Sequence, residues 1–261
     1  MKVIGEEWGK IDPVAGALGW CEENLAGSDL SRAVAALVDG AGVKQVTTTA
    51  ALIASMPPSV ARTEGAVAVA RQWFPGLGGL EGASGSRLVQ PETVDWLGRL
   101  DVVSMRRVLD EETWSWATSD PSSMADFLLS VTNQPLGDWP ATCLARQLAR
   151  NDPTKALDWT ALLPANQALL AGGEAYAEWR SAQPESATAW LEHLPSEDPR
   201  RDAFFQTAIR TMVHEPQAAE QLAAMNPTER AAARGVIEQM TSLSPQRRVQ
   251  LLTGLSGTLD H

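Results

Sequence analysis

Cysteine and histidine are scarce in this chain of 261 residues. The two cysteines, Cys21 and Cys143, lie far apart and form no CxxC pattern, which argues against a disulfide framework or a thiolate zinc site. Three histidines in the whole chain leave little for metal binding or acid–base catalysis. We therefore expect a reducing compartment, no metal and no cofactor.

Long hydrophobic runs are absent as well. The longest uncharged stretch, from Gln45 to Ala61, contains three threonines and two consecutive prolines, and it is too short and too polar to span a bilayer. The segment after Met1 turns acidic where a secretory signal would be apolar. These features predict a cytoplasmic protein without membrane contact; a periplasmic or extracellular location stays open if the chain is an excised domain.

Basic residues are outnumbered, because 21 lysines and arginines face 32 aspartates and glutamates, which gives a net charge of −11. An acidic chain is a poor match for nucleic acid or for an anionic membrane surface. We expect instead a protein or peptide partner with a basic or neutral surface. The hydrophobic share of 44% is typical of a folded globular chain and excludes disorder.

Catalytic motifs are missing too. The chain contains neither the GxSxG of a nucleophile elbow nor the GxxxxGK[ST] of a phosphate-binding loop. His214-Glu215 begins like a zinc-protease motif, but Pro216 would break the required helix and Ala218 stands in place of the second histidine. No residue is therefore assigned a catalytic or metal-binding role.

Proline, in contrast, is regularly spaced. Pro91, Pro121, Pro153, Pro184 and Pro216 follow one another at intervals of 30, 32, 31 and 32 residues. Such a fixed period is typical of repeat architectures. A second proline follows three of them by 11 residues, in Leu163-Pro164, Leu194-Pro195 and Asn226-Pro227.

Each repeat unit is interpreted as a pair of helices. Asp120 and Asp152 directly precede a proline, so that an N-cap acceptor stands before a residue suited to the first helical position. The residue before the second proline is pushed out of the helical region, which ends the first helix. That proline can then open the second helix, as Asn226-Pro227-Thr-Glu229 suggests by its capping-box pattern. Counting back from Met56-Pro57 places another unit at Val46.

These patterns predict an all-α fold, a right-handed α-solenoid of about seven helix-turn-helix repeats. N-terminal repeats are expected over 1–75 and C-terminal repeats over 91–261, in one continuous solenoid. The glycine-rich stretch over 76–90 is expected to be an insertion or hinge. Five of the ten tryptophans recur at repeat-locked positions and are expected in the core: Trp8, Trp116, Trp159, Trp179 and Trp190.

The repeat resembles that of tetratricopeptide proteins. Trp159 and Trp190 correspond to the leading tryptophan of that family, Ala175 and Trp179 fall near the small residue and the aromatic of its second helix, and Pro184 falls at its terminal proline. HEAT-type repeats, and bacterial repeats marked by tryptophan and Asp-Pro at a period of about 32 residues, stay open as alternatives. The resemblance implies a platform for binding other proteins.

The favoured hypothesis is therefore a non-enzymatic scaffold or regulatory subunit that binds a protein or peptide. By analogy with tetratricopeptide repeats, the first helices would line the partner, at Ala125, Leu128, Leu157, Thr160, Thr188 and Leu191. Three aromatics outside the repeat phase are further candidates: Trp73, Phe74 and Trp139.

Two other hypotheses stay open. One is an enzyme or small-ligand-binding protein with the glycine-rich insertion as a lid and Glu192, His193 and Asp198 in a pocket. The other is an architectural protein that self-assembles end to end, which the polar residues 254–261 disfavour.

Overall fold

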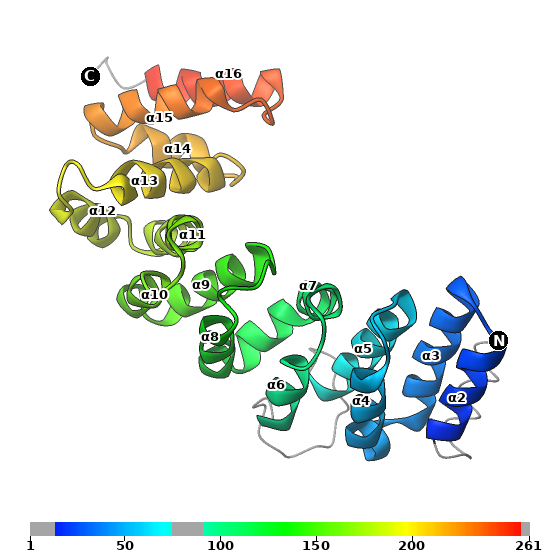
Figure 1. The fold of residues 1–261 in the computed structure, drawn as a ribbon. Helices are drawn as coiled ribbons and strands as arrows, with labels where there is room; N and C mark the ends of the chain where they lie inside the picture. The colour runs from blue at the N-terminus through cyan, green and yellow to red at the C-terminus, as the bar shows by residue number, and fades with distance from the viewer. Residues whose placement is uncertain (1–13, 75–90, 257–261) are drawn as a thin grey trace. The chain divides into compact units, whose positions relative to one another are not determined.

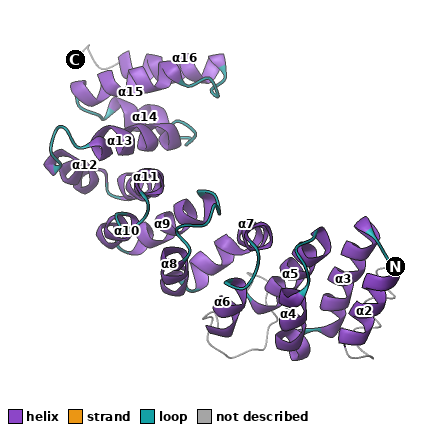
Figure 2. Cartoon of the chain, viewed as in Figure 1, coloured by secondary structure: helices purple, strands orange, loops and turns teal. Residues whose placement is uncertain are grey.

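The computed structural model describes residues 14–74 and 91–256, and these ranges are helical (Figures 1 and 2). They contain fifteen α-helices, one 3-10 helix and no strand, which confirms the prediction of an all-α fold. None of these helices combines the length and hydropathy of a membrane span. The helices are α2 (Val14–Asn24), α3 (Gly27–Ala41), η1 (Val43–Gln45), α4 (Val46–Ser55), α5 (Val60–Trp73), α6 (Pro91–Leu97), α7 (Val102–Ser119), α8 (Pro121–Ser130), α9 (Trp139–Asn151), α10 (Pro153–Thr160), α11 (Ala165–Ala182), α12 (Pro184–His193), α13 (Pro199–Met212), α14 (Ala218–Ala223), α15 (Pro227–Gln239) and α16 (Pro245–Ser256).

Several helices begin where the proline pattern predicts. Asp120 and Asp152 cap α8 and α10, and each side chain accepts a hydrogen bond from the backbone N–H three residues on, at 3.2 and 3.1 Å. The capping box of α15 is complete, because Asn226 Oδ1 accepts from Glu229 N at 2.9 Å while Glu229 Oε2 accepts from Asn226 N at 3.1 Å. The unit start inferred at Val46 is the first residue of α4.

Other helices start later than their prolines. Pro216 lies in a turn, and α14 begins two residues on, at Ala218. Pro195 also stays outside a helix, since α13 begins at Pro199 behind Asp198. The Asp198 carboxylate accepts a hydrogen bond from Arg200 N at 2.9 Å. Asp198 is a better N-cap than Leu194, so the helix begins behind it, four residues further along the chain.

The chain divides into two compact units, residues 1–144 and 145–261. In the first unit α3 packs on α5, and α5 packs on α7 (Figure 1). In the second unit α11 packs on α13 and α13 on α15 in the same manner. The expected insertion over 76–90 and Trp8 lie outside the described residues.

Tryptophans occupy the core at the repeat-locked positions. Trp116 is fully buried, with Phe74 and Phe127 at ring-centroid distances of 5.1 and 5.2 Å. Trp159 and Trp179 are each 8% exposed. The prediction of core packing is confirmed for these three tryptophans, and Trp190 is half-buried.

Two glycines let α11 and α13 approach closely. A Cβ on Gly172 would lie 2.4 Å from Phe204 Cζ, and a Cβ on Gly173 would lie 2.7 Å from Thr207 Oγ1. Real Cβ atoms do not come this near to other atoms, so the helix spacing depends on the missing side chains. The close packing fixes α13 on α11 and thereby the helix face that carries Phe205.

Candidate functional site: a cleft between α12, α13 and α15

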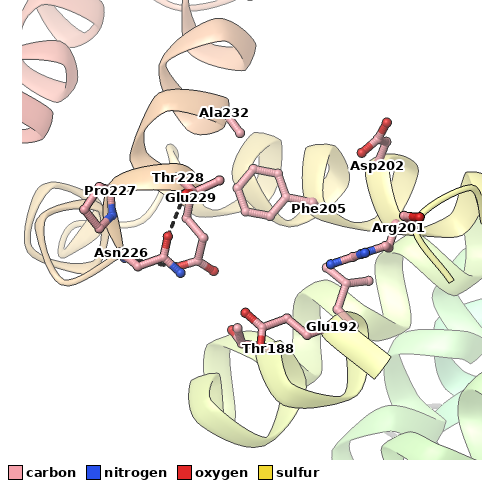
Figure 3. A pocket seen from close by; sticks show the side chains of 12 residues that line it. Thr188, Glu192, Arg201, Asp202, Phe205, Asn226, Pro227, Thr228, Glu229 and Ala232 are labelled. Carbon is pink, nitrogen blue, oxygen red and sulfur yellow. Dashed lines mark hydrogen bonds between the residues drawn. The ribbon is translucent and has the colours of Figure 1, made fainter. Parts of the chain in front are cut away.

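A cleft of about 580 Å³ lies in the second unit between α12, α13 and the start of α15 (Figure 3). Helix α12 contributes Thr188, Leu191 and Glu192, and Ser196 comes from the connection to α13. The remaining lining residues come from α13 and from the N-terminal part of α15 with its cap: Arg201, Asp202, Phe205, Asn226, Pro227, Thr228, Glu229 and Ala232.

Local sequence holds two of these walls in place. The α13 wall is set by the Asp198 cap, and the α15 wall is set by the reciprocal bonds between Asn226 and Glu229. The α12 wall ends at Leu194, whose extended backbone, with ψ of 145°, precedes Pro195 as the steric rule for pre-proline residues requires. The cleft is thus bounded by well-defined helix ends.

Arg180 of α11 lies behind the cleft and contacts two of its walls. Its Nη2 donates to Glu229 Oε1 at 3.0 Å, and its guanidinium carbon lies 5.1 Å from the centroid of the Phe205 ring. The side chain of Arg180 is only 5% exposed. A buried guanidinium held by a carboxylate and a ring face is a rigid element, so Arg180 positions the walls from α13 and α15 together.

Tyr176 of α11 packs against aromatic side chains of α12 and α13. It is fully buried, and its ring lies 6.1 Å from that of Phe204 and 6.3 Å from that of Trp190. Burial raises the pKa of the Tyr176 hydroxyl, although the Arg180 guanidinium lowers it in part. The hydroxyl is therefore protonated and neutral at physiological pH and adds no negative charge near Arg180.

The charges on the cleft wall are mainly negative. Three acidic residues and one basic residue line it, and Glu229 is already engaged by Arg180 and by Asn226 N. Glu192 and Asp202 are exposed and form no ion pair with any described residue. In Figure 3 the Phe205 ring is directed into the space between the helices, and the Glu192 side chain lies along α12 beside Thr188.

The cleft contains two of the six residues expected on the first helices, Thr188 and Leu191. Leu157 and Thr160 of α10 are instead buried: Thr160 is 2% exposed and its Oγ1 donates to Leu157 O at 2.9 Å. On α8, Leu128 is 6% exposed and Ala125 is half-buried. Leu128, Leu157 and Thr160 face the core because these positions pack on neighbouring helices, so they offer little surface to a partner.

None of the three aromatics expected to contact a partner lines the cleft. Phe74 is 2% exposed and packs on Trp116, so its ring belongs to the core. Trp73 is half-buried in an edge-to-face contact with Trp96 at 5.4 Å, and it lines a smaller groove of about 290 Å³ in the first unit. Trp139, at the start of α9, is 45% exposed.

The acid–base set of the alternative hypothesis is not assembled. Of its three residues only Glu192 lines the cleft. His193 is exposed, with Nδ1 2.6 Å from Ala189 O, and hydrogen bonds from Arg200 lower the pKa of the Asp198 carboxyl even though slight burial raises it. Within residues 14–74 and 91–256 no group of three or more histidine, cysteine, aspartate or glutamate side chains is placed to hold a metal ion.

The sequence did not identify Phe205, Arg180 or Glu229 as site residues. Phe205 appears in the sequence only as one apolar residue of a second helix, and Glu229 only as part of a capping box. Packing between helices brings Phe205 and Glu229 to the same cleft as the residues of α12, and no local sequence pattern predicts this packing.

Comparison with known proteins gives no match: neither protein-family models, nor curated proteins, nor solved structures include one that is similar to this chain.

Proposed function

We propose that the chain is a non-enzymatic scaffold, an α-solenoid of tetratricopeptide-like helix pairs that binds a protein or peptide. Side-by-side packing of successive second helices within each unit supports the repeat architecture. Stacked helix pairs of this kind bury their shared faces and leave grooves between neighbouring pairs. Such grooves are common sites for a peptide segment.

The observation that carries the proposal is the cleft between α12, α13 and α15. It combines an apolar surface, from Leu191, Phe205 and Ala232, with polar groups around it, which is the usual composition of a recognition site. The rim of the cleft at residues 226–228 is exposed. An exposed rim around an apolar floor suits the binding of a segment from another chain.

The partner is proposed to have a basic or neutral surface, because the chain carries a net charge of −11. Complementary charges accelerate association at low ionic strength, and added salt screens them. Binding of the physiological partner is therefore expected to slow as salt is raised.

The test is a tagged pull-down from native lysate at low and moderate salt, with two matched variants of α15. Ala232→Arg places a long charged side chain in the cleft, whereas Ala231→Arg makes the same change at an exposed neighbour that does not line it. We expect one stoichiometric partner that wild type and Ala231→Arg retain and Ala232→Arg loses. Equal retention by both variants, or no partner at either salt, would overturn the proposal.

A further inference from the structure

The cleft contains an apolar seat that is fixed before any ligand arrives. The Phe205 ring is half-buried, and Arg180 holds it from behind at 5.1 Å. Leu191 of α12 and Ala232 of α15 complete the apolar lining around it. A seat whose side chains are already ordered binds an apolar side chain with a smaller entropic cost.

Next to this seat lies an uncompensated negative charge. Glu229 cannot supply it, since Oε1 accepts from Arg180 and Oε2 accepts from Asn226 N. Glu192 has no ion-pair partner among the described residues and lines the cleft, where its side chain lies along α12 beside Thr188 (Figure 3). Asp202 adds a second unpaired carboxylate from α13, while Arg201 is the single cation on the wall. The two unpaired carboxylates outnumber the single guanidinium by one, so the unpaired groups carry a net negative charge that favours a cationic ligand.

We infer that the occupant of the cleft is a peptide segment in which a lysine or arginine stands next to an apolar residue. The apolar side chain lies on Phe205, and the cationic group pairs with Glu192. This inference rests on the proposed function and adds the chemistry of the ligand. A negatively charged segment directed by Arg201 is the competing outcome.

The first experiment is a selection from a phage-displayed library of short random peptides, with the full chain as bait. The baits are wild type, Glu192→Gln, and the control Glu185→Gln, which removes the same charge at an exposed position of α12 outside the cleft. We expect wild type and Glu185→Gln to enrich peptides with a basic residue beside an apolar one, and Glu192→Gln to lose that preference. Enrichment of acidic peptides, or the same basic preference with all three baits, would overturn the inference.

The second experiment measures the affinity of the most enriched peptide by fluorescence anisotropy. A charge-assisted contact predicts binding about ten-fold weaker in Glu192→Gln than in wild type, with Glu185→Gln unchanged. Equal affinity in Glu192→Gln and wild type refutes the cationic ligand, while the proposed function survives if Ala232→Arg abolishes binding and Ala231→Arg does not. If Ala232→Arg and Ala231→Arg both bind the peptide as wild type does, or if no peptide is enriched at all, the inference and the proposed function are both wrong.

Discussion

Arg180 and Glu229 form a largely buried ion pair between α11 and α15, at 3.0 Å from Nη2 to Oε1. Their side chains are 5% and 18% exposed. Glu229 is also the third residue of α15 and completes the capping box with Asn226. One carboxylate therefore links the start of α15 to a helix 49 residues earlier in the chain, and the same guanidinium supports Phe205.

Replacement of Arg180 by methionine is expected to destabilise the protein by about 3 kcal/mol, because the carboxylate of Glu229 would stay partly buried without its counter-charge. The matched control is Arg146→Met, which breaks the more exposed pair between Arg146 and Glu174 and is expected to cost less than about 1 kcal/mol. Urea denaturation followed by circular dichroism measures both. Equal losses of unfolding free energy in the two variants would show that the Arg180–Glu229 pair stabilises the protein no more than the exposed Arg146–Glu174 pair.

Gly172 provides a second prediction. A methyl group there would meet the Phe204 ring at 2.4 Å, so Gly172→Ala is expected to lower the free energy of unfolding by about 1–3 kcal/mol through overpacking. A methyl group on Gly235 in α15 would meet no atom within 4 Å, and Gly235→Ala is expected to stabilise by about 0.5–1 kcal/mol through helix propensity. Thermal unfolding of the two variants tests the opposite signs. Stabilisation by Gly172→Ala would contradict the close approach of α11 and α13.

The helices were predictable wherever a cap and a proline stand together in the sequence. Asp152-Pro153 determines a helix start through a side-chain acceptor and a fixed φ, both local properties. Pro216 failed as a marker, since α14 begins two residues later. A missing N-cap side chain does not by itself explain this, because α12 begins at Pro184 behind Gln183, whose side chain makes no cap hydrogen bond.

The cleft was predictable only in part. Thr188 and Leu191 line the cleft from a first helix, and only Thr188 of the two is more than slightly exposed, since Leu191 is 8% exposed and the equivalent α10 residues Leu157 and Thr160 are 7% and 2% exposed. Whether such a position lines a cleft depends on the packing of neighbouring helices, here α12, α13 and α15, which is set by residues far apart in sequence. Repeat periodicity predicts which positions are equivalent, but it does not predict whether a neighbouring helix covers the side chain at each of them.

Glu112 of α7 provides a prediction on pH. Burial raises the pKa of its carboxyl above the ordinary value of 4.5, although Arg71 opposes the shift. A raised folded-state pKa means that the stability contributed by the neutral form is fully present below about pH 4.5 and is lost as pH rises through the folded-state value. Glu112→Gln is therefore expected to be more stable than wild type at neutral pH and similar to it near pH 4. Denaturation midpoints across this range are the measurement, with Glu238→Gln at an exposed site as the control; a pH-independent difference would contradict the prediction.

Asp101, the N-cap of α7, is expected to show the opposite pH dependence. Partial burial raises the pKa of its carboxyl. Hydrogen bonds from the N–H and hydroxyl of Ser104 and the charge of Arg62 at 3.3 Å together lower the pKa by more than burial raises it, so the net shift is downward from 3.8. A lowered folded-state pKa stabilises the protein above about pH 3.8, and this contribution is lost as pH falls through the folded-state value. Asp101→Ala removes the cap, so it is expected to cost about 1–2 kcal/mol at neutral pH and less in acid. Asp110→Ala, an exposed change on the same helix, serves as the control and is expected to cost little at any pH. If the cost of Asp101→Ala stays constant from neutral pH to pH 3, the charge of Asp101 does not contribute to the cap.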